Sequence, residues 1–407
     1  MVDQKTELEP MKFSISCSLK ALVEALKFAN SFVQSRPSHP VLCGVLLKAK
    51  DNSLTLETTD LRHGCKITIP ATVNIANSTI IPCKELLALL TNFVGDTIDI
   101  FLTESARNES STLLGGSTND YDYLAVAQLG SQQAFLATFH PNEFPDIQSI
   151  KPDHTVNLSA EQLVAAIERS SYTVSRDDTK QVLCGVNLQS KPDGLYFAGT
   201  NGHYLGITTI DGNFDPSLSV TIPVIFFSRL QKLLKDVDTV IIEMNDSSVQ
   251  ASITAVLAKE VIVDVCLYTR ILEGTYPAYN RLIPTDFSRE VKVSREGLVQ
   301  ALGLIGVCIT ESVNTNESCV VDIKEDEILV SKSGAAIKTV SQVVKSELLI
   351  GEPIIIGLNH NYFKNILTSL SSDQVIIYLN ETGNPVIIKG VDEPLETTAL
   401  LMPVQLR

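Results

Sequence analysis

One motif occurs three times in this chain and limits the folds that it can adopt. The pattern Ser-x-x-x-Leu-Val-x-Ala-Leu/Ile stands at residues 18–26, 159–167 and 294–302, so successive copies begin 141 and 135 residues apart. Each serine suits the N-cap of a helix, and the leucines and valine that follow form one apolar face. Apolar and polar residues alternate before each serine, as they do in a strand. The sequence therefore predicts a strand, a cap and a helix three times over.

The similarity between copies continues beyond these helices. VLCGV at 41–45 recurs at 182–186, and Ile-Pro at 81–82 recurs at 222–223. The segments KELLALLTNF, FFSRLQKLLKD and NHNYFKNILTSL each predict a second short amphipathic helix. Stretches rich in valine, isoleucine and threonine predict the strands between them. We therefore expect an α+β fold in which each copy packs two helices on antiparallel sheets and neighbouring copies join edge to edge.

These repeats predict three tandem domains after a flexible N-terminal leader. The expected bounds are 1–10 for the leader and 11–150, 151–285 and 286–407 for the domains. A polar insertion at 104–133 lengthens the first domain, and its composition predicts an exposed loop or an extended hairpin.

Composition narrows the class of protein. No stretch approaches the roughly 20 apolar residues of a membrane span, and the polar N-terminus lacks the apolar core of a signal peptide, so we expect a cytoplasmic protein. The eight cysteines include no C-x-x-C pair and are expected to be free and mostly buried. The net charge of -15 argues against a conventional nucleic-acid binder, because such binding depends on neutralising phosphates.

The sequence contains no recognisable catalytic motif. It lacks G-x-S-x-G, a P-loop and H-E-x-x-H, and its six histidines do not cluster. His203 and Cys184 are the nearest candidates for a base and a nucleophile, and we expect them to serve neither role. We predict a protein that is not an enzyme and has no catalytic residue, metal ion or cofactor.

Three further segments carry a resemblance to a known family. TNGHYL at 200–205, EGTYPAYNRLIP at 273–284 and the closing LLMPVQLR occur in order together with the three repeats. This combination resembles the bacterial DNA sliding clamps, the beta subunit of DNA polymerase III holoenzyme, and the likeness extends from Met11 to Arg407. The resemblance implies three tandem DNA-clamp domains in a head-to-tail homodimeric ring around duplex DNA, associated with the nucleoid. Such a ring tethers the polymerase for processive synthesis and catalyses no reaction.

A ring of this kind explains how a protein of acidic composition could stay bound to DNA. Because it stays on DNA by topology, weak non-specific phosphate contacts suffice, and basic side chains should line the hole while acidic ones cover the outside. The residues expected to face DNA are Lys20, Lys27, Arg36, Lys84, Arg169, Arg176, Lys180, Arg229, Lys232, Lys235, Arg295 and Lys364.

The resemblance also implies two protein-binding surfaces. The helix that contains GLVQALGLIGVCI is apolar on nearly all sides and needs a cover, which a second copy of the chain would supply by bringing Phe135 and Leu136 against Val307 and Cys308. A groove between domains two and three would bind short linear motifs of polymerase and clamp-loader subunits. Its residues would be Leu183, Thr200, Gly202, His203, Tyr204, Leu205, Pro277, Arg281, Leu282, Asn359, Tyr362, Pro385, Leu400, Met402, Pro403 and Val404.

An alternative function keeps the clamp fold but does not involve DNA. A clamp-fold scaffold could retain the peptide groove and dock proteins without encircling a duplex. In either case Tyr204 replaces an arginine common at this position in the family, which changes the polar rim of the groove.

Overall fold

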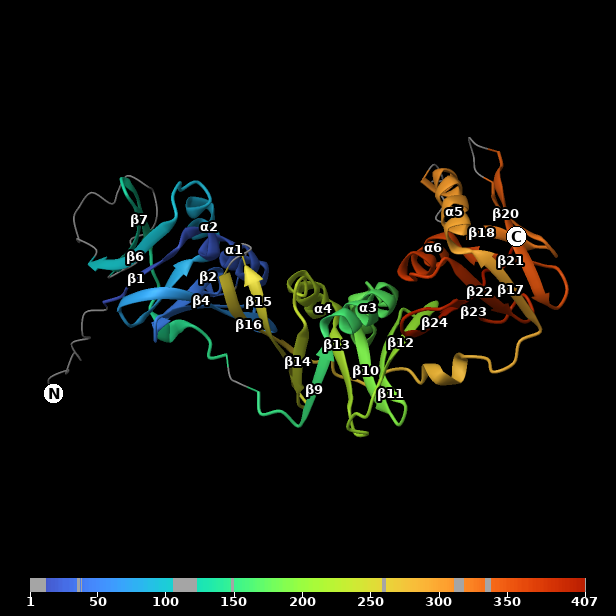
Figure 1. Ribbon diagram of the computed structural model, residues 1–407, viewed down its shortest axis with the longest axis horizontal. Helices are drawn as coiled ribbons and strands as arrows, with labels where there is room; N and C mark the ends of the chain where they lie inside the picture. Colours follow the sequence, from blue (N-terminus) through green and yellow to red (C-terminus); the bar gives the residue numbers. More distant parts are fainter. Residues whose placement is uncertain are drawn as a thin grey trace. The chain divides into compact units, whose positions relative to one another are not determined.

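The computed structural model describes residues 12–34, 37, 39–104, 123–147, 150–257, 261–310, 318–333 and 338–406, without the side chains of 104, 257 and 308–310. The chain divides into two compact units (Figure 1). Unit one comprises residues 1–158 and 230–270, and unit two comprises residues 159–229 and 271–407.

An antiparallel sheet forms the body of unit one. Its strands run in the order β8-β7-β6-β1-β4-β16-β15-β14-β9, and β2, β3 and β5 join it beside β4. The strands are β1 Ser14–Ser18, β2 Gly44–Lys50, β3 Ser53–Thr59, β4 His63–Ile75, β5 Ser78–Pro82, β6 Thr97–Glu104, β7 Tyr123–Leu129, β8 Gln132–Ala137, β9 His154–Ser159, β14 Thr239–Met244, β15 Ser248–Leu257 and β16 Val261–Arg270.

Two helices cover part of this sheet. The helices α1 (Leu19–Ala29) and α2 (Cys83–Leu90) pack against each other, and α1 also contacts β1, β3 and β4 (Figure 1). Leu22 and Leu26 of α1 are fully buried, as their spacing on one helix face requires. The core of unit one therefore lies between these helices and the sheet.

A second antiparallel sheet forms the body of unit two. Its strands run in the order β13-β10-β11-β12-β24-β23-β22-β17-β20-β19-β18-β21. They are β10 Gly185–Lys191, β11 Gly194–Thr200, β12 Tyr204–Asp211, β13 Ser219–Pro223, β17 Arg289–Ser294, β18 Ser318–Ile323, β19 Glu327–Lys332, β20 Val340–Ile350, β21 Ile354–Asn359, β22 Gln374–Leu379, β23 Val386–Gly390 and β24 Glu396–Leu401.

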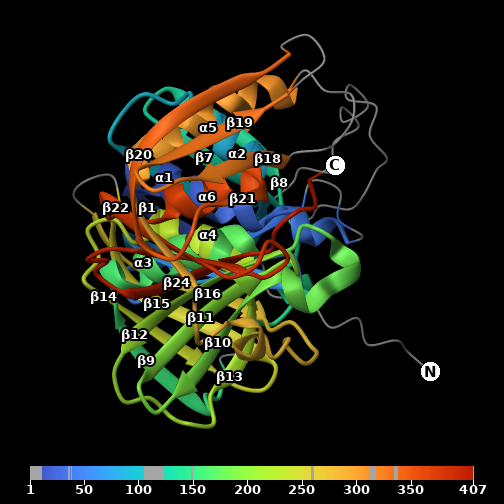
Figure 2. The same ribbon diagram turned by 90° about the vertical axis from the view of Figure 1, so that its right-hand side faces the viewer.

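Three helices lie on the sheet of unit two. They are α3 (Ala160–Ser170), α5 (Arg295–Thr310) and α6 (His360–Ser369). Helix α5 lies along β20 and β19 and packs against α6, which also contacts α3 (Figure 2). A further helix, α4 (Val224–Leu230), ends at the boundary between the units.

The predicted strand, cap and helix are confirmed in all three copies. Ser18 Oγ accepts a hydrogen bond from the amide of Ala21 at 3.3 Å, and Ser159 Oγ accepts one from Gln162 at 3.5 Å. Ser294 Oγ accepts one from Gly297 at 3.2 Å. The predicted second helices are confirmed as α2, α4 and α6.

The expected edge-to-edge joining of copies is also confirmed. Strand β4 of the first copy pairs with β16 of the second, and β12 of the second pairs with β24 of the third. The second copy shares one sheet with the first copy and another with the third. The boundary between the two compact units therefore falls within the second copy.

The insertion at 104–133 is ordered sheet at its C-terminal end. Residues 123–129 form β7, which pairs with β6, and the turn at 130–131 leads into β8. Residues 105–122 lie outside the described part of the chain, as does the leader, so the exposed loop or extended hairpin expected there stays a prediction. Among described residues, Cys17, Cys65, Cys83 and Cys319 are buried and form no disulfide bond. No helix among the described residues is long and apolar enough to span a membrane.

Candidate peptide groove

The chain's C-terminal segment is docked in unit two. In the pairing of β12 with β24, Tyr204 stands opposite Leu401 and Leu205 opposite Leu400. Beyond the strand, the amide of Met402 donates to the carbonyl of His203 at 2.9 Å, and the amide of Val404 donates to Gly357 at 2.8 Å. Residues 402–404 are therefore held by backbone hydrogen bonds to His203, just before β12, and to Gly357 of β21.

The turn at 200–204 is fixed by its own side chains. Asn201 Oδ1 accepts from the amides of His203 at 2.9 Å and Tyr204 at 3.2 Å, and Thr200 Oγ1 donates to the Tyr204 carbonyl at 2.7 Å. Gly202 has φ +93°, which favours glycine. Asn201 is the one residue of this turn that was not expected in the groove, although the Asn-Gly pair itself is typical of a hairpin turn.

An apolar cluster forms the floor beside this turn. Leu205 and Leu400 are buried in it, and Met402 packs against it while partly exposed. The segment that carries Pro277, Arg281 and Leu282 joins the same cluster through Tyr276 and Tyr279. Leu282 in this segment is 57% exposed.

Helix α6 supplies the opposite wall. Asn359 caps it by accepting from the amide of Tyr362 at 3.0 Å. The Tyr362 ring stacks on Tyr204, with ring centroids 4.1 Å apart and planes at 11°, and its hydroxyl accepts from Asn201 Nδ2 at 3.1 Å. Pro385 directly precedes β23, whose Val386 pairs with Leu401. The turn, the tail and α6 are thus joined by direct contacts.

Tyr204 takes a structural position that an arginine could not fill in the same way. Its hydroxyl donates to the carbonyl of Tyr172 at 2.5 Å, and its ring is buried in the core cluster of unit two. Burial raises the pKa of Tyr204 to about 12, so the phenol stays a neutral donor at pH 7. Tyr172, which the sequence did not single out, thereby connects the end of α3 to Tyr204.

A polar pocket lies beside the turn at 200–204. It has a volume of about 560 Å³, and His203, Tyr204 and Tyr362 of its lining are among the residues expected in a peptide groove. Arg176 and Lys180, which were expected to face DNA, line it from the segment after α3. The remaining lining residues are Tyr172, Val174, Ser175, Asp177, Asn201, Asn361 and Asn365.

The basic residues expected to face DNA fall into different environments. In unit one Lys20, Lys27, Lys84, Lys232 and Lys235 are exposed, and Lys27 pairs with Glu24 at 2.7 Å. Arg229 and Lys364 are partly buried, and Arg36 lies outside the described residues.

One of these expectations is wrong. Arg169 is buried, and its Nη2 lies 2.8 Å from Glu393 Oε2, so it is committed to an internal ion pair and is not free for phosphates. Arg295 is half-buried and donates through Nε to the carbonyl of Ser372 at 2.7 Å, just beyond the C-terminus of α6.

One of the residues expected at the dimer interface is buried in the structure. Strand β8 is at the edge of its sheet, and Phe135 on it is 59% exposed. Leu136 points into unit one and is only 6% exposed, so its side chain is not available to a partner. On α5, Val307 is 51% exposed, as is Leu304 at 47%, while the side chain of Cys308 is outside the described part.

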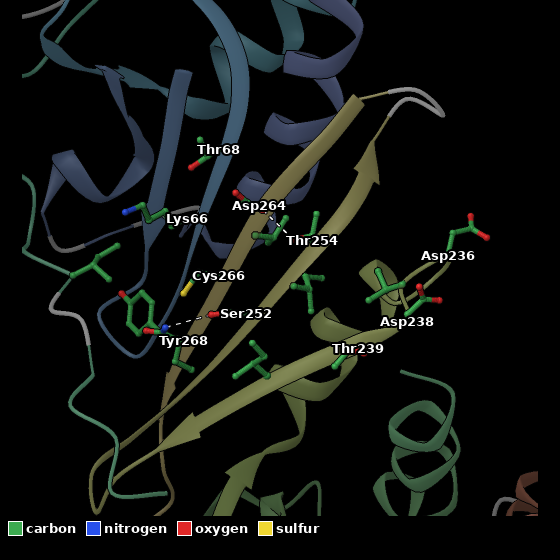
Figure 3. Close-up of a pocket in the computed structure, with 16 residues that line it drawn as sticks. Lys66, Thr68, Asp236, Asp238, Thr239, Ser252, Thr254, Asp264, Cys266 and Tyr268 are labelled. Atoms are coloured by element: carbon green, nitrogen blue, oxygen red, sulfur yellow. Dashed lines mark hydrogen bonds between the residues drawn. The ribbon is translucent and has the colours of Figure 1, made fainter. Parts of the chain in front are cut away.

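A pocket of about 740 Å³ lies on the sheet of unit one (Figure 3). Cys266 and Tyr268 of β16 line it, and Thr254 Oγ1 donates to Asp264 at 3.0 Å across the β15–β16 pair (Figure 3). Burial raises the pKa of Cys266 to about 11 and that of Tyr268 to about 12, so both are neutral at pH 7. Neither can act as an anionic nucleophile.

Cys184 is equally unsuited to nucleophilic chemistry. Burial, followed by the charges of Asp178 and Asp177, raises the pKa of its thiol, which donates to the carbonyl of Asp177 at 3.4 Å. Within the described residues no group of three or more histidine, cysteine or acidic side chains could hold a metal ion.

Comparison with known proteins identifies the family. Models of the DNA polymerase III beta subunit match in chain order, the N-terminal domain at 11–148, the central domain at 157–278 and the C-terminal domain at 280–405. A beta sliding clamp of Synechococcus elongatus is 30% identical over 397 residues, which cover 96% of this chain and 99% of that protein. One of Rickettsia felis is 23% identical, with coverage of 95% and 98%.

Solved structures agree on the fold. The DNA polymerase sliding clamp of Bacillus subtilis has a TM-score of 0.84 at 20% identity and covers 98% of this chain and 100% of its own. The beta sliding clamp of C. crescentus has a TM-score of 0.85 at 18% identity, with coverage of 97% and 99%.

The architecture is that of a DNA clamp, with three tandem domains of helices packed on antiparallel sheets. The chain belongs to the DNA polymerase III beta subunit family, the beta sliding clamps. Like the rest of that family it is a non-catalytic processivity subunit and not an enzyme.

Proposed function

We propose that two copies of this chain close head to tail into a ring around duplex DNA and tether the replicative polymerase through the groove. The single observation that carries this proposal is the match of all three clamp domains, in order, to one chain. A family of sliding clamps implies a task that depends on enclosing DNA, and that task explains how an acidic chain with net charge -15 can work on DNA.

The DNA-facing surface would use the exposed basic residues that remain after the corrections. Lysine side chains on the helices and loops of unit one are solvated, which suits weak and mobile phosphate contacts. The proposed set is Lys20, Lys27, Lys84, Lys232 and Lys235, with Arg229 and Lys364 as partly buried contributors.

The ring would close through apolar side chains left uncovered in one copy. The exposed pair Leu304 and Val307 on α5 would pack on the β8 edge of a second copy, where Phe135 is exposed. An open sheet edge also offers backbone groups for pairing, which supports this choice of surface.

The groove would bind short peptides with leucine or aromatic side chains. Leu205 and Leu400 are buried beneath the surface here, so the partly exposed Met402 and the exposed Leu282 would supply the apolar contacts. Burial of about 300 Å² at about 25 cal/mol/Å² gives about 7.5 kcal/mol before ordering costs. Association costs of at least about 4 kcal/mol leave about 3.5 kcal/mol or less, which is a millimolar or weaker Kd from the apolar contacts alone and would let polymerase and clamp-loader subunits exchange.

Sedimentation analysis at low micromolar concentration tests the ring. We expect a mass of twice the 44.3 kDa chain. A stable monomer would contradict the proposal. The double variant Phe135→Ser/Val307→Ser should shift the protein toward monomer, whereas Val94→Ser, another exposed apolar residue of unit one, should not.

A further inference from the structure

We propose that the pocket on the sheet of unit one is a docking site for a peptide segment that carries lysine or arginine beside aliphatic side chains. Every residue of the proposed groove belongs to unit two, whereas unit one forms this pocket, so the inference does not depend on the groove. The pocket's volume of about 740 Å³ falls within the range of about 300–1,000 Å³ that is common for ligand sites.

The sheet beneath the pocket offers a ligand its side chains and not its backbone. Strand β15 pairs with β14 and β16, and β16 pairs with β15 and β4, so the backbone groups of both strands already have partners. Ser252, Cys266 and Lys66 line the pocket from neighbouring positions on β15, β16 and β4. A peptide would therefore lie across this face and would not extend the sheet.

An aliphatic side chain of the ligand would find apolar contacts in the pocket. Ile241 of β14 lines it and is 41% exposed. Val237, just before β14, and Ile147, in the segment after β8, line it as partly buried residues. Because covering exposed apolar surface is favourable, these residues favour a ligand with an apolar part.

The charges of the pocket favour a cation. Asp236 and Asp238 lie before β14 and Asp264 lies on β16 (Figure 3), and in the described part of the chain none of them has an ion-pair partner. Lys66 is the one cation among the described lining residues, and its Nζ lies 4.0 Å from Glu57 Oε1. A carboxylate outside the lining thus already faces this lysine, and the three aspartates are left for a ligand.

The remaining polar side chains do not change this balance. The hydroxyl of Thr254 donates to Asp264 Oδ1 at 3.0 Å, which positions the carboxylate without neutralising it. Because burial raises the pKa of Cys266 to about 11 and that of Tyr268 to about 12, neither adds a charge at pH 7. The acidic lining disfavours nucleic acid, and the exposed isoleucine favours a peptide over a small polyamine.

Fluorescence anisotropy with three labelled heptapeptides tests this proposal on the full chain. One peptide alternates lysine with leucine, the second alternates lysine with serine, and the third alternates glutamate with leucine. At about 0.05 M salt we expect the lysine–leucine peptide to bind at least about fivefold more tightly than either of the others. Its advantage over the glutamate–leucine peptide should shrink at about 0.5 M salt, because the ion pairs are exposed.

Two double variants separate the pocket from the general acidity of the surface. Asp236→Asn/Asp264→Asn should weaken binding of the lysine–leucine peptide about fivefold. Asparagine suits position 236, where φ is +61°. Asp51→Asn/Asp96→Asn removes two exposed aspartates of the same unit outside the pocket and should leave binding unchanged.

A second pair of variants tests the apolar contact. Ile241→Ser should weaken the lysine–leucine peptide about fivefold while it leaves the lysine–serine peptide unchanged. Val94→Ser, at an exposed apolar residue of unit one outside the pocket, should alter neither peptide.

Three results would overturn the proposal. Equal binding of the lysine–leucine and lysine–serine peptides, or equal losses in the two aspartate double variants, would mean that surface charge alone attracts the peptide. Displacement of the lysine–leucine peptide by an unlabelled apolar nonapeptide would place it in the groove of unit two. A change of sedimentation mass in Ile241→Ser with unaltered peptide binding would show that this face packs against a second copy of the chain.

Discussion

A buried ion pair joins the second and third clamp domains, and its removal should destabilise unit two. Glu393 accepts at Oε1 from the amides of Ser371 at 2.8 Å and Ser372 at 2.9 Å, and at Oε2 from Arg169 Nη2 at 2.8 Å. The side chains of Arg169 and Glu393 are only 5% and 4% exposed. The substitution Glu393→Gln keeps the shape of the side chain, but it places an amide NH₂ group against the donors that now bind the carboxylate.

The magnitude follows from the burial. Loss of one partner from a buried ion pair costs about 3–5 kcal/mol, since the remaining charge stays desolvated. The pKa shift of Glu393 gives a similar free energy. Burial alone would raise the pKa of Glu393, but hydrogen bonds from Ser372, Arg169 and Ser371 outweigh it and lower the pKa from 4.5 to about 2. At 1.36 kcal/mol per unit, this shift corresponds to about 3 kcal/mol of stability at neutral pH.

Hydrogen exchange in urea is the appropriate assay, because a chain with two units is not expected to unfold in one step. Amides of β22, β23 and β24 should exchange with a free energy of opening about 3 kcal/mol lower in Glu393→Gln. The matched control is Glu381→Gln, whose carboxylate is 79% exposed and 4.0 Å from Arg289, and it should change stability by less than about 0.5 kcal/mol. A loss below about 1 kcal/mol in Glu393→Gln would refute the reasoning.

The Glu393 carboxylate also makes the stability of unit two depend on pH. Its folded pKa is lowered, so its stabilisation is complete above about pH 4.5 and is lost as pH falls toward 2. In Glu393→Gln this part of the acid destabilisation should be absent. If wild type and variant lost stability equally as the pH falls from 4.5 to 2, Glu393 would not be the group responsible.

Three further predictions concern the groove, the dimer and the DNA surface. Met402→Ser or Leu282→Ser should weaken binding of an apolar nonapeptide about tenfold, because each removes one apolar contact; unchanged anisotropy titrations would count against the groove. Tyr204→Phe should leave peptide affinity within about twofold but lower stability by about 1 kcal/mol, since the Tyr172 carbonyl loses its donor; a large loss of affinity would show that the hydroxyl contacts the ligand. Lys20→Gln/Lys84→Gln should reduce the salt dependence of DNA binding by about two phosphate contacts, measured as the slope of log K against log salt; an unaltered slope would exclude these lysines.

Local signals allowed much of the fold to be predicted. The capping serines Ser18, Ser159 and Ser294 and the leucines after them specify helices within a few residues of chain, so the three helices that follow them were found. The resemblance also pointed to Phe135 and Leu136, which lie on β8 at the edge of its sheet. Alternation did not decide which side of that strand faces inward, because the burial of Leu136 and the exposure of Phe135 depend on β7 beside it.

Long-range contacts explain what the sequence analysis missed. Arg169 follows the helical pattern of an exposed basic residue, and its partner Glu393 is 224 residues away in the chain. Arg295 is satisfied by the carbonyl of Ser372, which no local pattern reveals. The pocket that unites Arg176 and Lys180 with Tyr362 likewise exists only because α6 packs beside the end of α3.

Retention on DNA of different topology tests most directly whether this protein holds DNA by enclosing it. The protein, loaded onto nicked circular plasmid with a clamp loader and ATP, should remain bound through gel filtration, and cutting the plasmid once should release it within minutes. Blocking the new ends with bulky proteins should restore retention. Equal persistence on circular and on open-ended linear DNA would mean that adhesion, or a scaffold without a ring, holds the protein there, and the proposed enclosure would be wrong.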